Sequence, residues 1–292
     1  MQANSMCISC LLAKQEKLIR EFADEAKKSE YMHEVLRLLY EKGQSESAPA
    51  LYEILNRMLF DFWGKAEDYT EIKKKFNTLL LSREAELTRR IEAAADPISE
   101  CIRYVCAANY IDFAAVKSVD EETFAGLLKK AAEQTVPAEE YASFRAELDA
   151  ARSLVYLTDN CGEIVLDKIF IKFLKAAYPS LAITAILRGE SVINDATMED
   201  AREVGLCDVI PCIGNGNGAP GTVLHRLSDD ARALLYGADV IIAKGQGNFE
   251  SLYGEGLHPY FLFLCKCELF VRRFGLARYE SVFVREDRIR MK

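Results

Sequence analysis

The segment DNCGEIVLDK, at residues 159–168, puts two carboxylates and an amide close together in the chain. Asp159 and Asn160 come just after the apolar run at residues 153–157, and Glu163 follows three positions later. An Asp-Asn pair in this place can cap the helix that follows. The same side chains also offer the oxygen ligands that Mg²⁺ and Mn²⁺ prefer. The motif alone is compatible with both roles.

Polar or glycine-rich segments also follow the next three apolar runs. The carboxyl ends of parallel strands meet at one edge of an open sheet, and ligands bind there. We therefore expect these segments to face one shared site. The segment GNGNGAPGT, at residues 214–222, fits a dinucleotide-binding glycine pattern only formally, because it contains Pro220 and lacks the usual acidic residue after the next strand. The candidate residues in the other two segments are Arg188, Asn194, Asp195, Lys244, Gly245, Asn248 and Glu250.

Histidines are few and scattered in this sequence. His33, His225 and His258 lie apart from one another, and none follows a predicted strand beside the polar segments. This pattern argues against a histidine-rich zinc site and against a Ser-His-Asp triad. A cation held by a few oxygen ligands keeps positions open for water and for a phosphate oxygen, and Lys244 would supply further positive charge. The combination predicts chemistry on a phosphate group.

Nine cysteines are an odd number, so they cannot all pair within the chain. Two pairs stand out, Cys7-x-x-Cys10 and Cys265-Lys-Cys267. If they meet in space, they could form a four-thiolate metal site or a redox pair. The alternative is that they are free thiols packed as small apolar groups, since Cys265 and Cys267 end an apolar run.

The elements that position these residues change in character near residue 150. Before it, apolar residues recur at intervals of three and four, which predicts helices. After it, short apolar runs alternate with helical patterns, which predicts strands buried on both faces of a mainly parallel sheet. We expect an α/β fold, a three-layer α/β/α sandwich of Rossmann-like type at 151–292, with an all-helical subdomain at 1–150. The six predicted strands are 153–157, 181–187, 207–213, 238–243, 261–265 and 280–284.

Charge and hydropathy exclude several classes of partner. The 292 residues carry a formal net charge of −8, and the isoelectric point is near 5.2. Such a chain is a poor ligand for nucleic acid or for an anionic membrane surface. We find no apolar stretch of the ~18 residues needed to span a bilayer, and the N-terminus lacks the features of a secretion signal. The sequence predicts a cytoplasmic protein.

Four motifs, taken in order, resemble the signatures of a known family. DNCGEIVLDK, RGESVINDAT, GNGNGAPGT and KGQGNFE look like those of the damage-control metal phosphatases, which share the ARMT-like domain. The resemblance covers most of the chain, because Asn109-Tyr-Ile-Asp112 in the helical half is similar to the family's Asn-x-x-Asp element. It implies an α/β/α sandwich with a helical N-terminal region, and it implies that Asn109 and Asp112 close the site from the helical side.

The same resemblance implies roles for individual residues. The family's metal ligands fall on Asp159, Asn160 and Asp195, and its phosphate-contacting lysine falls on Lys244. The two cysteine pairs resemble the archaeal and bacterial branch of the family, which favours their meeting in space. The residues expected around the phosphate and the rest of the substrate are Asn109, Asp112, Glu163, Arg188, Gly245, Asn248 and Glu250.

These observations lead to one functional hypothesis with two alternatives. The resemblance implies a phosphatase that uses Mg²⁺, Mn²⁺, Co²⁺ or Ni²⁺ to hydrolyse a small sugar phosphate, a phosphopantetheine-like compound or a nucleotide-like compound. A phosphorylated aspartate intermediate is disfavoured because the carboxylates are better used as metal ligands. The first alternative is a carboxylate methyltransferase that seats its cofactor on the glycine-rich loop. The second is a module that binds a phosphorylated metabolite without turnover.

Overall fold

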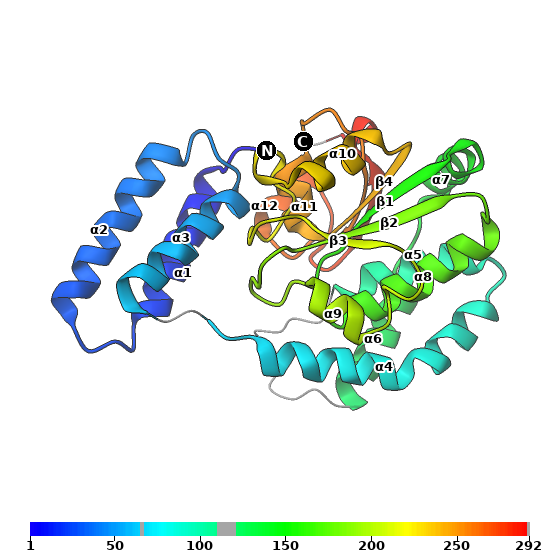
Figure 1. The fold of residues 1–292 in the computed structure, drawn as a ribbon, viewed down its shortest axis with the longest axis horizontal. Coiled ribbons are helices and arrows are strands. Elements are labelled where there is room, and N and C mark those ends of the chain that lie inside the picture. Colours follow the sequence, from blue (N-terminus) through cyan, green and yellow to red (C-terminus); the bar gives the residue numbers. More distant parts are fainter. Residues whose placement is uncertain (65–66, 110–120, 291–292) are drawn as a thin grey trace.

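Helices fill the described part of residues 1–150 in the computed structural model, which describes residues 1–64, 67–109 and 121–290. The first three helices enclose a core of their own, which includes the buried side chains of Leu11, Val35 and Leu55. They stand together on the left of Figure 1. Their bounds are α1 (Ser5–Ile19), α2 (Glu25–Lys42) and α3 (Ala48–Trp63).

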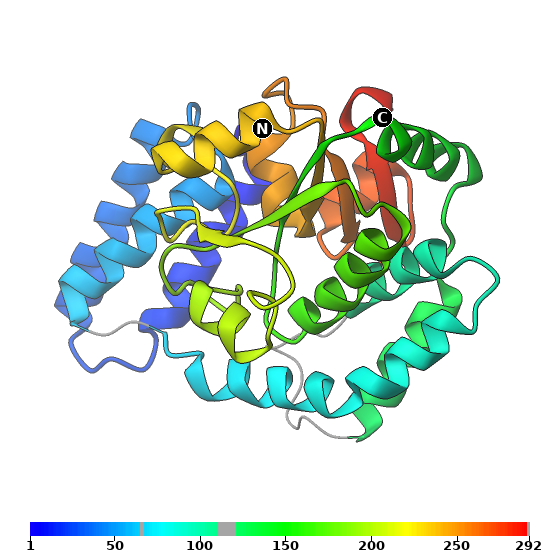
Figure 2. The same cartoon turned by 45° about the vertical axis from the view of Figure 1, so that its right-hand side comes forward.

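The next four helices belong with the sheet. Side chains of α4, α5, α6 and α7 share one apolar core with one face of the strands. The longest of them, α4, runs along the lower side of the molecule in Figure 2 and packs against the helix that follows the first strand. The bounds are α4 (Thr70–Glu92), α5 (Pro97–Ala108), α6 (Glu121–Glu133) and α7 (Ala138–Ala150).

Six strands form one sheet in the order β3-β2-β1-β4-β5-β6. All neighbouring pairs are parallel except β5 and β6, which are antiparallel. The chain builds outward from β1 in one direction and from β4 in the other, so the strand order reverses between these two central strands. The bounds are β1 (Ser153–Leu157), β2 (Ala182–Leu187), β3 (Cys212–Gly214), β4 (Val240–Lys244), β5 (Tyr260–Leu264) and β6 (Ser281–Arg285).

Helices cover both faces of this sheet, as Figure 1 shows. Alternate residues of β1 point to opposite sides: Leu154 and Tyr156 join the core under α4, α5 and α8, whereas Val155 and Leu157 join the core under α10, α11 and α12. The predicted three-layer α/β/α sandwich is therefore confirmed. The remaining helices are α8 (Glu163–Ala177), α9 (Met198–Glu203), α10 (Asp229–Gly237), α11 (Gly245–Leu252) and α12 (Glu268–Phe274), with short 3₁₀ turns η1 (Leu224–Arg226) and η2 (Glu286–Arg288).

One strand is much shorter than predicted. The apolar run at 207–213 was expected to be a strand throughout, but pairing with β2 begins only at Cys212. The backbone N–H groups of Val209 and Ile210 instead donate to the carbonyl of Leu206, at 2.9 and 3.2 Å, and form a turn. Proline cannot donate to a strand ladder, and Pro211 stands at the point where the strand begins. In the described residues, every helix is too short or too polar to cross a membrane.

Candidate active site

The candidate site lies where β1, β2 and β4 end, at the point of strand reversal. An isolated bridge between Asn160 and Asp195 joins the segments that leave β1 and β2, and a second bridge, between Arg188 and Thr197, closes the segment that leaves β2 on itself. The N–H of Ala196 also donates to the carbonyl of Asp159 at 2.7 Å. Backbone pairing thus brings together two segments that are more than 30 residues apart, as predicted from the strand order.

Two glycines allow the backbone to turn tightly here. Gly162 has φ +75° and Gly245 has φ +80°, both in the left-handed region that favours glycine. A Cβ at Gly245 would lie 2.1 Å from Oδ2 of Asp159. The N–H of Gly162 donates to Oδ1 of Asn77, on α4, at 2.7 Å. The backbone at Gly245 therefore lies directly against the Asp159 carboxylate, where no larger residue would fit.

Asp159 and Asn160 do not cap α8. The residue at the N-cap is Gly162, and no side chain bonds to the first N–H groups of that helix. The amide nitrogen of Asn160 instead lies 2.8 Å from Oδ2 of Asp159 and 2.7 Å from Oε1 of Glu163. The amide nitrogen of Asn109 contacts the same two oxygens, at 2.9 and 2.7 Å. Two amides thus stand between two carboxylates, and the capping interpretation is wrong for this pair.

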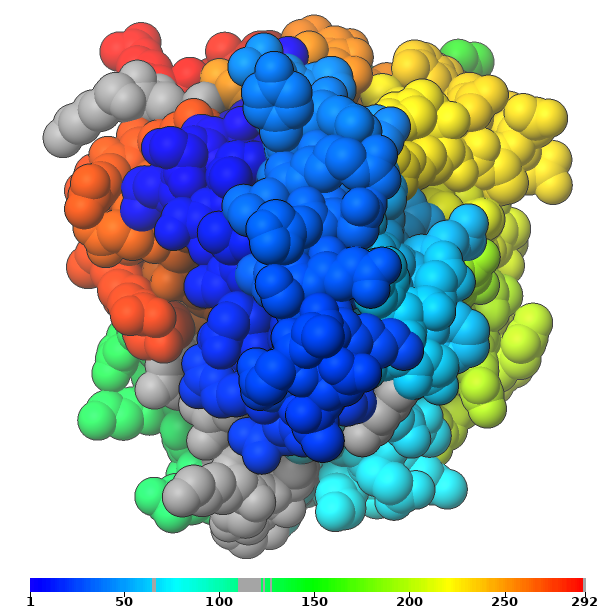
Figure 3. Space-filling view, turned by 90° about the vertical axis from the view of Figure 1, so that its left-hand side faces the viewer, coloured from blue at the N-terminus to red at the C-terminus, as the bar shows by residue number. Residues whose placement is uncertain are grey.

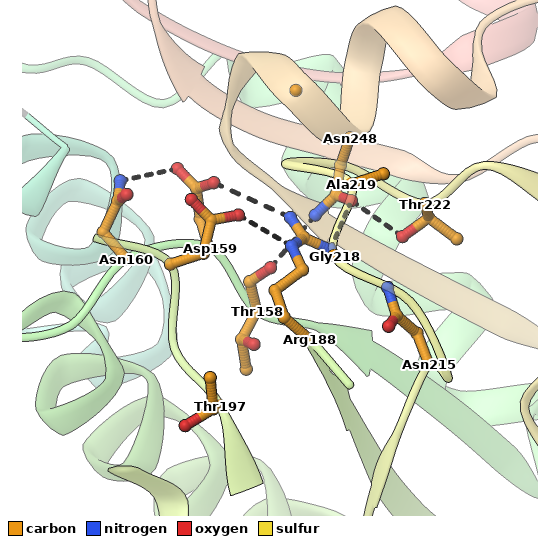
Figure 4. A network of polar contacts seen from close by, with 12 residues as sticks. Thr158, Asp159, Asn160, Arg188, Thr197, Asn215, Gly218, Ala219, Thr222 and Asn248 are labelled. Atoms are coloured by element: carbon orange, nitrogen blue, oxygen red, sulfur yellow. Dashed lines mark hydrogen bonds and ion pairs between the residues drawn. The ribbon is translucent and has the colours of Figure 1, made fainter. Parts of the chain in front are cut away.

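A buried arginine joins the second aspartate to the first. Arg188 is 2% exposed, and its Nε donates to Oδ2 of Asp195 at 2.7 Å. Its Nη2 lies 3.9 Å from Oδ1 of Asp159, and its Nη1 donates to Oδ1 of Asn248 at 3.3 Å. The hydroxyl of Thr222 donates to the same oxygen of Asn248 at 2.8 Å, so this amide is fixed in place. Figure 4 shows the guanidinium of Arg188 pointing toward Asp159.

Lys244 ends β4 and is completely buried. Its ammonium lies 3.1 Å from Oε2 of Glu163 and 3.2 Å from Oδ1 of Asp167. The hydroxyl of Tyr156 donates to that same oxygen of Asp167 at 2.6 Å. The lysine that was expected to contact phosphate therefore has two carboxylate partners here, one of which is Glu163 of the amide cluster.

The cluster carries more negative than positive groups. Within the described residues, the four carboxylates of Asp159, Glu163, Asp167 and Asp195 face the two cations of Arg188 and Lys244. Burial, and then Glu163 and Asp195, raise the pKa of the Asp159 carboxyl to about 8. Burial also raises the pKa of Asp167 and that of Asp195. Burial lowers the pKa of Lys244, but Asp167, Glu163 and Asp159 outweigh it, so this pKa ends above its usual value.

The donor set fits a hard divalent cation. A buried excess of two carboxylates is a costly arrangement that a dication would neutralise. The nitrogen and oxygen of an asparagine amide have nearly the same shape, so half a turn at Asn109 and Asn160 would present oxygen toward Asp159 and Glu163. As the side chains stand in the described residues, no group of three or more His, Cys, Asp or Glu is arranged as a coordination shell.

Several predicted residues lie outside this cluster. Asp112 falls outside the described residues. Glu250 lines a separate cavity, which also contains Cys7, Cys10 and Cys267. Cys7 and Cys10 thus line the same cavity as Cys267, whereas Cys265 is buried and does not line it, and all nine thiols of the chain are free. Asn194 donates to Oδ1 of Asn160 at 2.7 Å.

The glycine-rich loop packs closely against the protein. A Cβ at Gly189 would lie 2.5 Å from the backbone nitrogen of Gly216, and a Cβ at Gly247 would lie 1.9 Å from the carbonyl oxygen of Pro220. The side chain of Asn215 accepts from the N–H of Gly189 at 2.7 Å. Glycines at 189 and 247 thus let neighbouring backbone pack closely against the loop, and a Cβ at Gly221 in the loop itself would lie 2.5 Å from the carbonyl oxygen of Gly247.

Three side chains that contact residues of the candidate site were not predicted from the sequence. Asp167 lies one helical turn beyond Glu163 on α8, so its spacing could have revealed it. Asn77 and Thr222 carried no such signal, because their partners are far away in the sequence.

Comparison with known proteins supports a family assignment. A damage-control phosphatase of Archaeoglobus fulgidus is 31% identical over 283 residues, which cover 94% of this chain and 96% of that protein. A damage-control phosphatase of Pyrococcus horikoshii is 24% identical over 291 residues, covering 98% of each.

The fold agrees with a solved structure. A crystal structure of a DUF89 family protein from Pyrococcus horikoshii superimposes with a TM-score of 0.83 at 24% identity, over 98% of this chain and 99% of that one. The model of the damage-control phosphatase ARMT1-like domain matches residues 3–282. The chain therefore belongs to the damage-control phosphatase ARMT1-like domain family.

Proposed function

We propose that this protein is a divalent-metal-dependent phosphatase that hydrolyses a small phosphorylated metabolite. The observation that carries the proposal is the buried cluster of Asp159, Asn160, Asn109 and Glu163, with Asp195 and Arg188 beside it, at the strand reversal of an α/β sheet. Family membership supports it, as do the names of the Archaeoglobus and Pyrococcus relatives.

Asp159, Asn160 and Asp195 are the proposed metal ligands. A bound divalent cation supplies Lewis-acid chemistry, because it polarises a phosphoryl oxygen and makes water more acidic. Asp159 is held for this role from both sides, by the amides of Asn109 and Asn160 and by the backbone at Gly245. The neighbouring bridge between Asn160 and Asp195 sets the spacing of the two aspartates.

Arg188 and Lys244 supply the proposed positive charge for the phosphate. Nη2 of Arg188 is buried and makes no hydrogen bond within the described residues, so this donor is free for a phosphate oxygen. An arginine beside a phosphate can donate two parallel hydrogen bonds. Lys244 keeps Glu163 and Asp167 in fixed positions, and its ammonium offsets negative charge that develops as the phosphoryl group is transferred.

The closest test is a phosphatase assay on a panel of phosphorylated metabolites with Mg²⁺, Mn²⁺, Co²⁺ or Ni²⁺. The variant Asp159→Asn keeps the size of the side chain but removes its charge, and we expect it to lower kcat by at least about 100-fold. Asp229→Asn is the matched control, because the Asp229 side chain is 99% exposed on α10. An active Asp159→Asn variant, or a wild type that is inert with every cation and substrate, would contradict the proposal.

The two alternative functions predict other results. A carboxylate methyltransferase would bind a nucleoside cofactor without a metal, and the close packing of the glycine-rich loop gives no support for such a seat. A binding module would retain a phosphorylated metabolite without turnover. Calorimetric titration of the ligands, once in chelator and once with added cation, distinguishes both alternatives from the proposed enzyme, because a methyltransferase would bind its cofactor in chelator and a binding module would bind a metabolite that it does not convert.

A further inference from the structure

A cavity of about 340 Å³ lies between the N-terminal helices and the start of α11. Its walls come from α1, from the start of α3, from the segment before Asn194 and from the glycine-rich loop. In the space-filling view of Figure 3, the N-terminal helices (blue) adjoin the segment that follows β5 (orange). The volume falls in the range of small-molecule sites, which begins at about 300 Å³.

Three wall residues connect this cavity to the candidate active site. Gln246 directly follows Gly245, the residue that touches Asp159. Ile193 directly precedes Asn194, which donates to Asn160.

The third connection is Tyr52, on α3. Its helix packs against α11, the helix that begins at Gly245 beside Asp159. A molecule bound at the metal ligands would therefore have this cavity beside it.

The wall of the cavity is mostly apolar. Leu11, Pro49, Ile193 and Pro220 supply hydrocarbon surface. Three thiols add small, polarisable groups, and burial raises the pKa of Cys7 and that of Cys10, so both are neutral near pH 7. The charged members lie at Lys14, which is paired with Glu67 at 3.4 Å, and at Glu250. Such a wall offers few partners to a ring of hydroxyl groups, and a hydroxyl that loses water without gaining a partner binds poorly.

We propose that this cavity holds the organic half of the substrate and selects phosphomonoesters of largely apolar alcohols over phosphorylated sugars. The inference rests on the proposed phosphatase function and adds the class of alcohol to it. Cys10 is the specificity-determining residue that we single out, because it lines the cavity yet is exposed, so a larger side chain there can be accommodated by the fold.

Three phosphomonoesters test this inference: methyl phosphate, hexyl phosphate and glucose 6-phosphate. We expect kcat/KM for hexyl phosphate to exceed that for both others by about tenfold or more, because buried methylene groups add binding energy in a fitting pocket. Cys10→Trp should remove most of this preference and leave methyl phosphate unaffected. Cys10→Leu, which fills less space, should give an intermediate loss. Ala13→Trp is the control, since Ala13 is exposed on the same helix and does not line the cavity.

The outcomes separate this inference from the proposed function. If methyl phosphate is hydrolysed but glucose 6-phosphate equals hexyl phosphate, or if Cys10→Trp slows methyl phosphate as much as hexyl phosphate, the cavity has no role in selection. If no ester is hydrolysed, the phosphatase proposal fails. Calorimetric measurement of hexyl phosphate binding then tests separately whether the cavity binds the organic group. Tighter binding of hexyl than of methyl phosphate, lost in Cys10→Trp, would support the cavity; equal binding would overturn it.

Discussion

At the scale of single residues, the site is a set of buried charges that depend on one another. Arg188 faces Asp195 directly and Asp159 at longer range, while its Nη1 is fixed by Asn248. Glu163 connects the amide cluster to Lys244. Removing one member of such a buried pair leaves its partner uncompensated, which costs more than the pair itself contributes.

Arg188→Met should therefore destabilise the protein strongly. The change leaves the Asp195 carboxylate buried with its main partner gone, and breaking a buried pair in this way costs about 3–5 kcal/mol in the free energy of unfolding. The double variant Arg188→Met with Asp195→Asn should lose less than the sum of the two single changes. Denaturant unfolding of all four proteins completes the cycle. Strictly additive losses would mean that the two side chains do not interact.

At the scale of elements, two glycines with left-handed backbone conformation set the positions of the side chains in the candidate site. Gly245 begins α11 against Asp159, and Gly162 turns the chain into α8 while it bonds to α4. Asn77 fixes α4 at this turn, because it accepts from Gly162 and donates to Asp200 at 3.1 Å. The geometry of the candidate site thus depends on how three helices meet the strand ends.

Gly245→Ala should disturb the site more than its size suggests. The left-handed backbone alone disfavours alanine by about 1–2 kcal/mol, and the new Cβ would displace the Asp159 carboxylate. A displacement of about 1 Å in a reacting group can lower the rate 100-fold. Gly237→Ala is the control, since a Cβ there meets no atom within 4 Å. Assays and thermal unfolding of both variants check this, and equal behaviour would refute the role of Gly245.

Asn77→Leu should destabilise the turn into α8 from a distance. It leaves the buried N–H of Gly162 without its acceptor, and such a group costs about 1–3 kcal/mol. Thr78→Ala changes an exposed neighbour on the same helix and should be nearly neutral. Chemical denaturation gives the free energies, and hydrogen exchange at Gly162 locates the effect. An Asn77→Leu variant as stable as Thr78→Ala would show that this bond is dispensable.

The apolar pattern of the strands and the polar residues that follow them predicted the fold and the sheet edge at which the candidate site lies. The hydrogen-bond partners of individual side chains could not be predicted in the same way. The runs at 153–157 and 238–243 became the two central strands with shifts of at most two residues. The strand β3 is shorter than predicted, because its pairing begins only after Pro211. The pattern of apolar residues alone did not predict this late start. Pairings such as Asn77 with Gly162 could not be predicted, because they join residues 85 positions apart.

At the scale of the whole molecule, stability and cation binding are linked through the buried carboxylates. The strand ends of the sheet and the helices that cover it meet around a cluster with two more carboxylates than cations within the described residues. Folding of the metal-free chain is easier when some of these groups are protonated, and a dication competes with those protons. The free energy of unfolding should therefore depend on pH and on cation together.

Metal-free protein should lose stability as the pH rises. The pKa of Asp159 is about 8 in the folded protein and about 3.9 in an unfolded chain. The folded state thus binds this proton more tightly than the unfolded state does. The resulting contribution to the free energy of unfolding is complete below about pH 4 and is lost as the pH rises through about 8. The raised pKa values of Asp167 and Asp195 act in the same direction.

Added Mg²⁺ should offset that loss, because it binds the ionised carboxylates. At a free concentration 100 times Kd, it stabilises the folded state by about 2.7 kcal/mol, and the resulting rise in Tm should be larger at pH 8 than at pH 5.5. Asp159→Asn should abolish most of this pH dependence, whereas Asp229→Asn should behave like the wild type. Thermal scans in chelator and in Mg²⁺ measure both effects. A rise in Tm that is equal at the two pH values, or that survives in Asp159→Asn, would place cation binding away from the buried carboxylates.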